Sequence, residues 1–269
     1  MNSKKYLIIS LMIFLIILFL KIKNNYKSDS IQSIFNQGGY ILSFDDNYIH
    51  NWYKISSLLD KYKCKATFFV SGFGYLDNES INILLELQNK GHEIALHTLN
   101  HKSAIKYLLK SDLNNYIQYE INPELDSMNF YGFSPKTFSY PYGDNNVMMD
   151  SVLLEKFELL RDVTDSQRHF YSMFFKEYDQ LDEIFITNKS SNVIKGLGID
   201  KNYNVSINDI NKIFNRLSKN NEMVIFYCHN PVKKAYKKFQ IEIDYLENFL
   251  ILTNEYNLKS YRFMDLISN

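Results

Sequence analysis

Short apolar runs alternate along the chain with stretches of helical spacing, and this alternation constrains the fold most. The runs of strand character are residues 39–44, 65–70, 93–96, 137–139, 158–161, 184–186 and 223–227. Between many of them, apolar residues recur three and four positions apart. We expect helices at 81–90, 207–218 and 241–255, and a helical stretch at about 105–128 that Pro123 interrupts. Strands that alternate with helices form parallel sheets covered by helices. The sequence therefore predicts one α/β domain.

The start of the chain has the pattern of a membrane anchor. Residues 6–20 are almost entirely apolar and follow a short, positively charged start. This pattern is typical of a secretion signal or a spanning helix. Residues 21–27 contain no small-residue cleavage site, so we expect an uncleaved anchor. We divide the chain into an anchor with its flanks (1–27), a linker (28–38) and an extracytoplasmic domain (39–269), with a secreted protein as the alternative.

Charge and cysteine content exclude several classes of protein. The chain has 30 Lys and Arg against 30 Asp and Glu, so it has no net basic charge to hold nucleic acid, and we expect no nucleic-acid partner. Its two cysteines, Cys64 and Cys228, are too few for a disulfide framework or a cysteine-built zinc module. We expect two buried free thiols rather than one bridge.

Polar residues stand where the predicted strands end. Asp45 and Asp46 follow the first strand, His97 the third, Tyr142 the fourth and His229 the last. In a parallel barrel the carboxyl ends of the strands meet at one face, where active sites are built. These residues are far apart in the sequence, but we expect the topology to bring them together.

Two histidines and one aspartate form a candidate metal site, which we call the metal triad: Asp46, His97 and His101. Histidines four residues apart can reach one ion from a single turn, and two imidazoles with one carboxylate leave an open position, as in catalytic zinc sites. Non-haem iron oxygenases use the same ligand types, but usually begin with a close His-x-carboxylate pair, which is absent around His97. Histidine pairs with this spacing also occur as surface or core residues.

Six segments follow one another in a characteristic order: SFDD at 43–46, KATFFV at 65–70, GHEI at 91–94, HTLNH at 97–101, YPYG at 140–143 and VIFYCH at 224–229. In this order they resemble the motifs of NodB-like polysaccharide deacetylases, which form carbohydrate esterase family 4. The resemblance covers about residues 39–230. It implies a distorted (β/α) barrel, usually with seven strands, and metal-dependent removal of acetyl groups from a carbohydrate.

The resemblance also implies a role for each polar residue. A divalent metal, for which we expect zinc, would lie on the metal triad, and zinc lowers the pKa of a bound water to about 7. Asp45 would be the general base, and His229 the acid that protonates the departing amine. The backbone N–H of Tyr142 would face the oxyanion together with the metal.

One departure from the family concerns the general base. An Arg often stands two residues before the Pro of the YPYG motif and commonly braces the base, but Ser139 occupies that position here. We hypothesise that Arg161, at the end of the next predicted strand, braces Asp45 instead.

Two further departures concern the last strand. The Trp of the family's fourth motif is absent, and we consider Asp162 and Asp200 as the groups that orient His229. Tyr227 stands where a Leu often lines the acetyl pocket, which predicts a narrower pocket or a ring turned away from it.

We therefore expect a membrane-anchored, extracytoplasmic, metal-dependent deacetylase. The expected substrate is an N-acetylated glycan, either cell-wall glycan or a secreted poly-N-acetylglucosamine. An O-acetyl esterase of a polysaccharide is the nearest variant. A catalytically degenerate carbohydrate-binding protein on the same fold is the alternative from another class: the missing Arg and Trp favour it, and the retained Asp and His residues oppose it.

Overall fold

The structure is a computed structural model that describes residues 36–168, 177–187 and 191–267. The expected anchor, residues 1–27, and the linker up to residue 35 lie outside the described residues. Within the described ranges, no helix combines the length and apolar character needed to span a bilayer.

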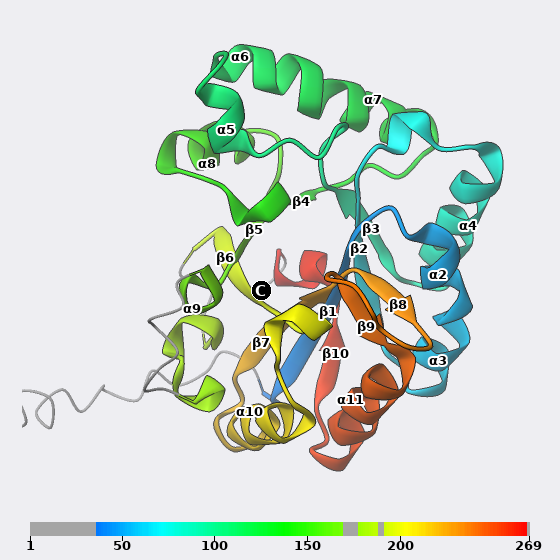
Figure 1. The fold of residues 1–269 in the computed structure, drawn as a ribbon, viewed down its shortest axis with the longest axis vertical. Coiled ribbons are helices and arrows are strands. Elements are labelled where there is room, and N and C mark those ends of the chain that lie inside the picture. The colour runs from blue at the N-terminus through cyan, green and yellow to red at the C-terminus, as the bar shows by residue number, and fades with distance from the viewer. Residues whose placement is uncertain (1–35, 169–176, 188–190, 268–269) are drawn as a thin grey trace, which may run out of the picture. The chain divides into compact units, whose positions relative to one another are not determined.

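Seven parallel strands of the described chain close into a barrel (Figure 1). They pair in sequence order, and β7 returns to β1 with a register from Gly39↔Met223 to Phe44↔Cys228. The predicted α/β barrel is confirmed. The bounds of its strands are β1 Gly39–Asp46, β2 Ala66–Val70, β3 Glu93–Leu96, β4 Thr137–Ser139, β5 Leu159–Val163, β6 Val193–Gly198 and β7 Met223–Cys228.

Three short strands lie outside the barrel cycle. β10 (Lys259–Tyr261) and β2 pair with the same edge of β1. β10 pairs with the first half of β1 and β2 with its second half. β8 (Asn230–Val232) and β9 (Gln240–Glu242) pair with each other. The loop between β8 and β9 follows directly from the end of β7, so it belongs to the face where the parallel strands end.

Helices surround the barrel (Figure 1). α10 shows why they form: Ser206 and Asp209 make a capping box, and the buried Ile210, Ile213, Phe214 and Leu217 recur at helical spacing. The α-helices are α2 Ile49–Lys54, α3 Ser56–Lys61, α4 Asn78–Asn89, α5 Ala104–Leu108, α6 Leu113–Tyr116, α7 Asn122–Phe130, α8 Val147–Leu153, α9 Asp165–Arg168, α10 Ile207–Asn220 and α11 Ile243–Glu255. The short 3₁₀ turns are η1 Phe73–Tyr75, η3 Pro141–Gly143, η5 Tyr178–Gln180, η6 Asp182–Ile184, η7 Lys201–Tyr203 and η8 Phe263–Leu266.

Side chains alternate between the two faces of each barrel strand. On β1, Leu42 and Phe44 belong to the large apolar cluster that the barrel shares with its helices, whereas Ile41 belongs to a separate inner cluster. This inner cluster contains one or two residues of most strands and is closed by Phe263 and Leu266 of η8. Because successive residues of a strand face opposite sides, every second residue of a barrel strand points inward. These inward residues form an inner row that runs to the carboxyl end of each strand.

At those ends the inner rows change from apolar to polar. On β1 the row runs from Ile41 through Ser43 to Asp45. The corresponding positions on and after the other strands are His97, Ser139, Arg161, Tyr227 and His229, all of which are buried. The barrel therefore has an apolar floor and a polar upper layer, and the polar layer forms the site.

One sequence prediction about the elements was wrong, and a second was confirmed only in part. Residues 184–186 were expected to form a strand, but η6 and a single antiparallel bridge between Ile186 and Met223 occupy this stretch. The sixth strand is β6. Its Lys and two Gly residues interrupt the apolar run by which a buried strand is recognised in a sequence. The helical stretch expected at 105–128 is present, divided into α5, α6, a π-helical segment at Ile117–Ile121 and α7. Pro123, the expected interruption, lies in the first turn of α7, and α5 also ends well before α6 begins.

The other helix predictions correspond to observed elements. The helices expected at 81–90, 207–218 and 241–255 are α4, α10 and α11. The two cysteines are buried and free, as expected from the sequence.

The glycines of β6 leave room for side chains of the upper layer. A Cβ added to Gly196 would lie 3.2 Å from Cδ1 of Tyr227 and 3.3 Å from Cδ of Arg161. A Cβ added to Gly198 would lie 2.5 Å from Cε2 of Tyr203, which is closer than real Cβ contacts. The residues that make β6 hard to recognise are therefore the ones that the packing of the site requires.

We expect the Gly198→Ala substitution to lower the free energy of unfolding by about 1–3 kcal/mol, because the Tyr203 ring must move. The ring is held by a 3.0 Å hydrogen bond between the hydroxyls of Tyr227 and Tyr203. In a Tyr203→Ala background the same glycine substitution should lower the free energy of unfolding by less. Urea unfolding of the four proteins of this cycle measures the difference, and an equal penalty in both backgrounds would contradict the steric explanation.

Candidate active site

A cavity of about 410 Å³ opens at the carboxyl ends of the barrel strands. The structure brings together in its lining every residue that the sequence analysis selected for catalysis or metal binding. These residues are Asp45, Asp46, His97, His101, Tyr142, Arg161 and His229. The convergence expected for a parallel barrel is therefore present.

The metal triad is compact. Its candidate ligand atoms lie within 4.8 Å of one another, and Oδ1 of Asp46 lies 3.2 Å from Nε2 of His101 and 3.8 Å from Nε2 of His97. Strict alternation would turn Asp46 to the outside of the barrel, but its φ of 82° lies in the left-handed region. This backbone turn at the end of β1 brings the two adjacent aspartates to the same site.

The loop that carries the two histidines is held by a buried carboxylate. Glu120 accepts hydrogen bonds from the backbone N–H of Asn100 at 2.8 Å and from its side-chain amide at 3.0 Å, and its carbonyl accepts one from Leu99. Thr98 and His101 have φ values of 68° and 51°, so the loop is not regular helix. Glu120 lies in the π-helical segment, and this positioning residue was missed by the sequence analysis.

Each imidazole of the triad is oriented by its other ring nitrogen. Nδ1 of His97 lies 2.7 Å from the carbonyl oxygen of Ser139, which can only accept, so Nδ1 carries the proton and Nε2 is free to bind a cation. Nδ1 of His101 lies 3.2 Å from the hydroxyl of Tyr142. Burial lowers the pKa of His97 well below its usual range and also lowers that of His101, so both favour the neutral form that binds metals.

The atoms of the triad fit a bound cation. Oδ1 of Asp46 and Nε2 of His97 are buried and have no hydrogen-bond partner among the described residues. Buried polar atoms normally have partners, and a divalent metal between a carboxylate oxygen and two imidazoles would satisfy both.

Arg161 contacts the second aspartate. Its Nη2 donates to Oδ2 of Asp45 and to Oγ of Ser139, and all three side chains are buried. The guanidinium carbon also lies 4.4 Å from the centre of the Tyr227 ring. Burial raises the pKa of Asp45, and the Arg161 charge opposes that rise. Oδ1 of Asp45 is buried without a hydrogen-bond partner among the described residues, on a residue that lines the cavity.

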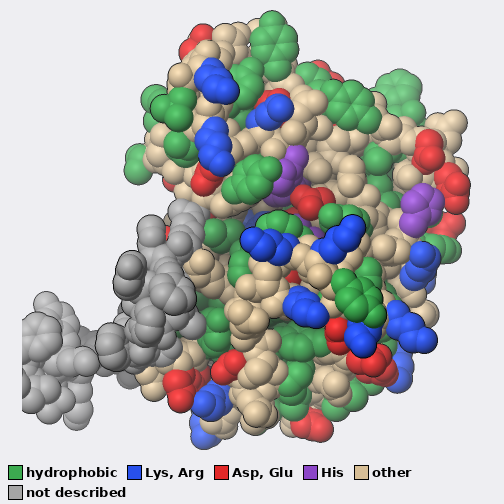
Figure 2. All heavy atoms as spheres, in the orientation of Figure 1, with side chains coloured by type: hydrophobic (Ala, Val, Ile, Leu, Met, Phe, Trp, Pro, Cys, Tyr) green, Lys and Arg blue, Asp and Glu red, His purple; other side chains and the backbone are tan. Residues whose placement is uncertain are grey.

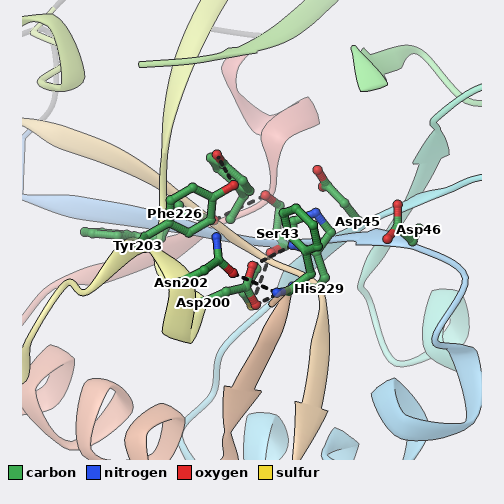
Figure 3. Close-up of polar contacts among 12 residues, drawn as sticks. Ser43, Asp45, Asp46, Asp200, Asn202, Tyr203, Phe226 and His229 are labelled. Carbon is green, nitrogen blue, oxygen red and sulfur yellow. Dashed lines mark hydrogen bonds and ion pairs between the residues drawn. The ribbon is translucent and has the colours of Figure 1, made fainter. Parts of the chain in front are cut away.

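His229 is paired with Asp200 (Figure 3). Nδ1 of His229 lies 2.6 Å from Oδ2 of Asp200, and its backbone N–H donates to Oδ1 at 3.1 Å. Burial lowers the pKa of His229, but the hydrogen bond and the charge of Asp200 outweigh it, so the net shift is upward. Of the two aspartates considered for this position, Asp200 is the one in contact. It follows β6, the strand that the sequence analysis missed.

The walls of the cavity include Tyr227, which was expected near the acetyl pocket, and two aromatic residues that the sequence analysis did not assign, Phe239 and Tyr203. Phe239 packs on His229 with 4.9 Å between ring centres, and its backbone N–H donates to Asn202 at 2.7 Å. Tyr203 and Tyr227 are joined through their hydroxyls. Tyr227 is thus held in the wall beneath Arg161. Phe239 lies in the loop before β9 and Tyr203 in the short 3₁₀ turn η7, where no periodic pattern in the sequence could have revealed them.

Trp52 is a core residue rather than part of a sugar groove. It is fully buried, and its indole N–H donates to the carbonyl of His229 at 2.9 Å. The only Trp of the chain therefore supports the backbone of the candidate acid.

The barrel and its polar upper layer define a hydrolase built around a candidate metal centre. The model of the polysaccharide deacetylase family matches residues 35–156, which include the metal triad, Asp45 and Tyr142. This match confirms the resemblance to NodB-like polysaccharide deacetylases and supports a deacetylase hydrolase. Comparison with curated proteins gives no match.

Solved structures of similar fold include other deacetylases. The peptidoglycan deacetylase PdaC from Bacillus subtilis is 18% identical, with a TM-score of 0.53, over 87% of this chain and 91% of that one. The catalytic domain of a peptidoglycan N-acetylglucosamine deacetylase from Eubacterium rectale is 15% identical, with a TM-score of 0.53, over 86% and 91%. The chitin deacetylase from Colletotrichum lindemuthianum is 14% identical, with a TM-score of 0.55, over 86% and 88%. At these identities the likeness concerns the fold.

We expect the Arg161→Ala substitution to reduce turnover by about 100-fold, because Asp45 loses the cation that fixes and stabilises its carboxylate. Metal content should remain that of the unchanged protein, since Arg161 contacts none of the triad atoms in the described structure. Acetate release and metal stoichiometry, measured on the same folded sample, check both statements. Unchanged turnover, or loss of the metal together with turnover, would contradict the bracing hypothesis.

Proposed function

We propose that the protein is a metal-dependent deacetylase of N-acetylated glycans. The observation that supports this most is the convergence of the metal triad with two further polar pairs, Asp45–Arg161 and Asp200–His229, in one cavity. A site that only bound carbohydrate would not need a buried ion pair and a carboxylate-oriented histidine beside a set of metal ligands. The retained pairs therefore favour catalysis over the degenerate binding protein.

The residues divide the chemistry between them. A divalent metal on the triad, for which we propose zinc, would supply Lewis acidity and an activated water at neutral pH. Asp45 is proposed to accept the water's proton at Oδ1, because Arg161 occupies Oδ2. The backbone N–H of Tyr142 is proposed to donate to the oxyanion of the acetyl group.

His229 is proposed as the general acid. Its Nδ1 is engaged by Asp200, which leaves Nε2 as the atom that can give a proton to the departing amine. The upward shift of its pKa favours the protonated ring, which is the form an acid requires. An amine leaving group needs this proton more than an alcohol does, which is why we favour an N-acetyl over an O-acetyl substrate.

The site of action is proposed to be outside the cell membrane. The apolar run at residues 6–20 and the positively charged start support an anchor that holds the barrel on the extracytoplasmic side. Cell-wall glycan and secreted poly-N-acetylglucosamine would both be within reach of such a protein.

Acetate release from a panel of acetylated glycans tests this function. We expect release that a chelator abolishes and added zinc restores. The His101→Gln variant should lose about 100-fold or more in activity because the metal contributes several kcal/mol. His50→Gln is the matched control, since His50 lies on α2 with an exposed side chain outside the cavity. Bound metal without acetate release from any glycan would favour the binding protein.

We expect the Asp200→Asn substitution to move the alkaline limb of the kcat/KM profile to lower pH by about one to three units. Asp200 stabilises protonated His229, so its loss lowers the pKa of His229 and the acid form disappears earlier as pH rises. The control is Asp60→Asn. Asp60 lies on α3 and forms an ion pair with Lys90, and this substitution should leave the profile unchanged. An unshifted limb in Asp200→Asn would exclude His229 as the titrating acid.

A further inference from the structure

A second cavity of about 600 Å³ adjoins the candidate active site. His101 and Tyr142 line both cavities, so they form the boundary between them. The rest of the second lining comes from the segment that runs from the histidine loop through α5 to the turn after it. We call this cavity the lysine groove after Lys102, Lys106 and Lys110, which line it.

The lysine groove carries three lysines that make no ion pair among the described residues. Residues 97–111 contain three lysines and no Asp or Glu. Among the residues the structure describes, no carboxylate makes an ion pair with any of the three ammonium groups. Two acids lie near the segment without pairing with its lysines: Asp112 caps α6 by accepting from Asn115, and Asp144 accepts from the hydroxyl of Ser103, which lines the groove.

The geometry connects the lysine groove to the reacting centre. Nζ of Lys106 lies 5.6 Å from the centre of the Tyr142 ring. Tyr142 is 58% exposed, and its hydroxyl contacts His101 of the metal triad. A chain of sugars with its acetyl group at the triad would therefore pass over an aromatic ring and reach the lysines.

A second lysine cluster lies on the other side of the site. The loop between β8 and β9 carries Lys233, Lys234, Lys237 and Lys238, all exposed, and no acid from 230 to 239. This loop ends at Phe239, which lines the active-site cavity. Figure 2 shows basic side chains gathered over the region of α5 and again near β8 and β9. Histidine (purple) and acidic (red) side chains lie between these two groups. A chain with zero net charge thus concentrates positive charge around one opening, which attracts anions.

We propose that the lysine groove binds negatively charged groups of the substrate, so that the glycan carries carboxylates or phosphates on units beside the acetylated sugar. This inference rests on the proposed function and narrows its substrate class. Lysine presents a compact point charge rather than the planar fork with which arginine grips a single phosphate or carboxylate. Three lysines spread along a groove therefore suit charges repeated along a polymer.

The test compares binding of three oligomers of equal length to the full-chain protein. The probes are a hyaluronan hexasaccharide, which has carboxylates, chitohexaose, which is neutral, and a hexamer of N-acetylglucosamine 1-phosphate units. We expect both anionic oligomers, or the one whose charge matches the natural polymer, to bind more tightly than chitohexaose at low salt. High salt should remove this preference, because exposed charges are screened.

Two triple variants separate the lysine groove from net charge. Lys102→Gln/Lys106→Gln/Lys110→Gln should weaken binding of the preferred anionic oligomer by about tenfold relative to chitohexaose. The control Lys63→Gln/Lys156→Gln/Lys219→Gln removes the same charge from exposed lysines that do not line the lysine groove, and it should retain the preference. Equal affinity for all three oligomers, no binding at all, or an equal loss in both variants would overturn the proposal.

Failure of this proposal and failure of the proposed function give different results. Chelator-sensitive acetate release from chitohexaose without any anionic preference would leave the deacetylase and remove the anionic substrate. Salt-sensitive binding of an anionic oligomer, lost in the groove variant but without acetate release from any glycan, would leave the lysine groove and remove the enzymatic function.

Discussion

The buried pair between Arg161 and Asp45 is the interaction around which the upper layer of the barrel is arranged. A guanidinium removed from water is tolerated only where acceptors and a polarisable surface surround it, and breaking such a pair costs about 3–5 kcal/mol. Here Asp45 and Ser139 accept from its Nη2 and the ring of Tyr227 lies against it, while Nε and Nη1 are buried without a hydrogen-bond partner among the described residues. Gly196 leaves the space beside it. A small residue at 139 and a glycine on β6 are thus consequences of placing the arginine on β5.

The same layer gives two neighbouring aspartates different environments. Strand alternation directs Asp45 into the barrel, where Arg161 neutralises it and leaves one oxygen free. The left-handed backbone at Asp46 turns the next carboxylate towards two neutral imidazoles. One carboxylate is thereby suited to a proton and the other to a cation. The lysine groove adds positive charge beside this cavity, with Lys106 next to the ring of Tyr142.

Much of the fold and of the site could be predicted from the sequence because both depend on local patterns. Apolar runs followed by Asp45, His97 and His229 indicated strands and the face on which they end. The sixth strand could not be recognised, because Gly196 and Gly198 have low strand propensity. They are required by side chains that pack against them in space, which the sequence does not show. Asp200 was only one of two candidates for the same reason: its position depends on where β6 ends.

The sequence alone determined the alternation of strands and helices, the order of the motifs and the chemical types of the reacting side chains, because these are properties of short segments. Tertiary structure alone decided which distant residues share a partner: Arg161 with Asp45, Asp200 with His229 and Glu120 with the histidine loop. Those pairings depend on the closure of the barrel between β7 and β1 and on the direction each side chain takes at the end of its strand. No segment contains that information by itself, because burial of a charge is defined only once the surrounding strands are in place.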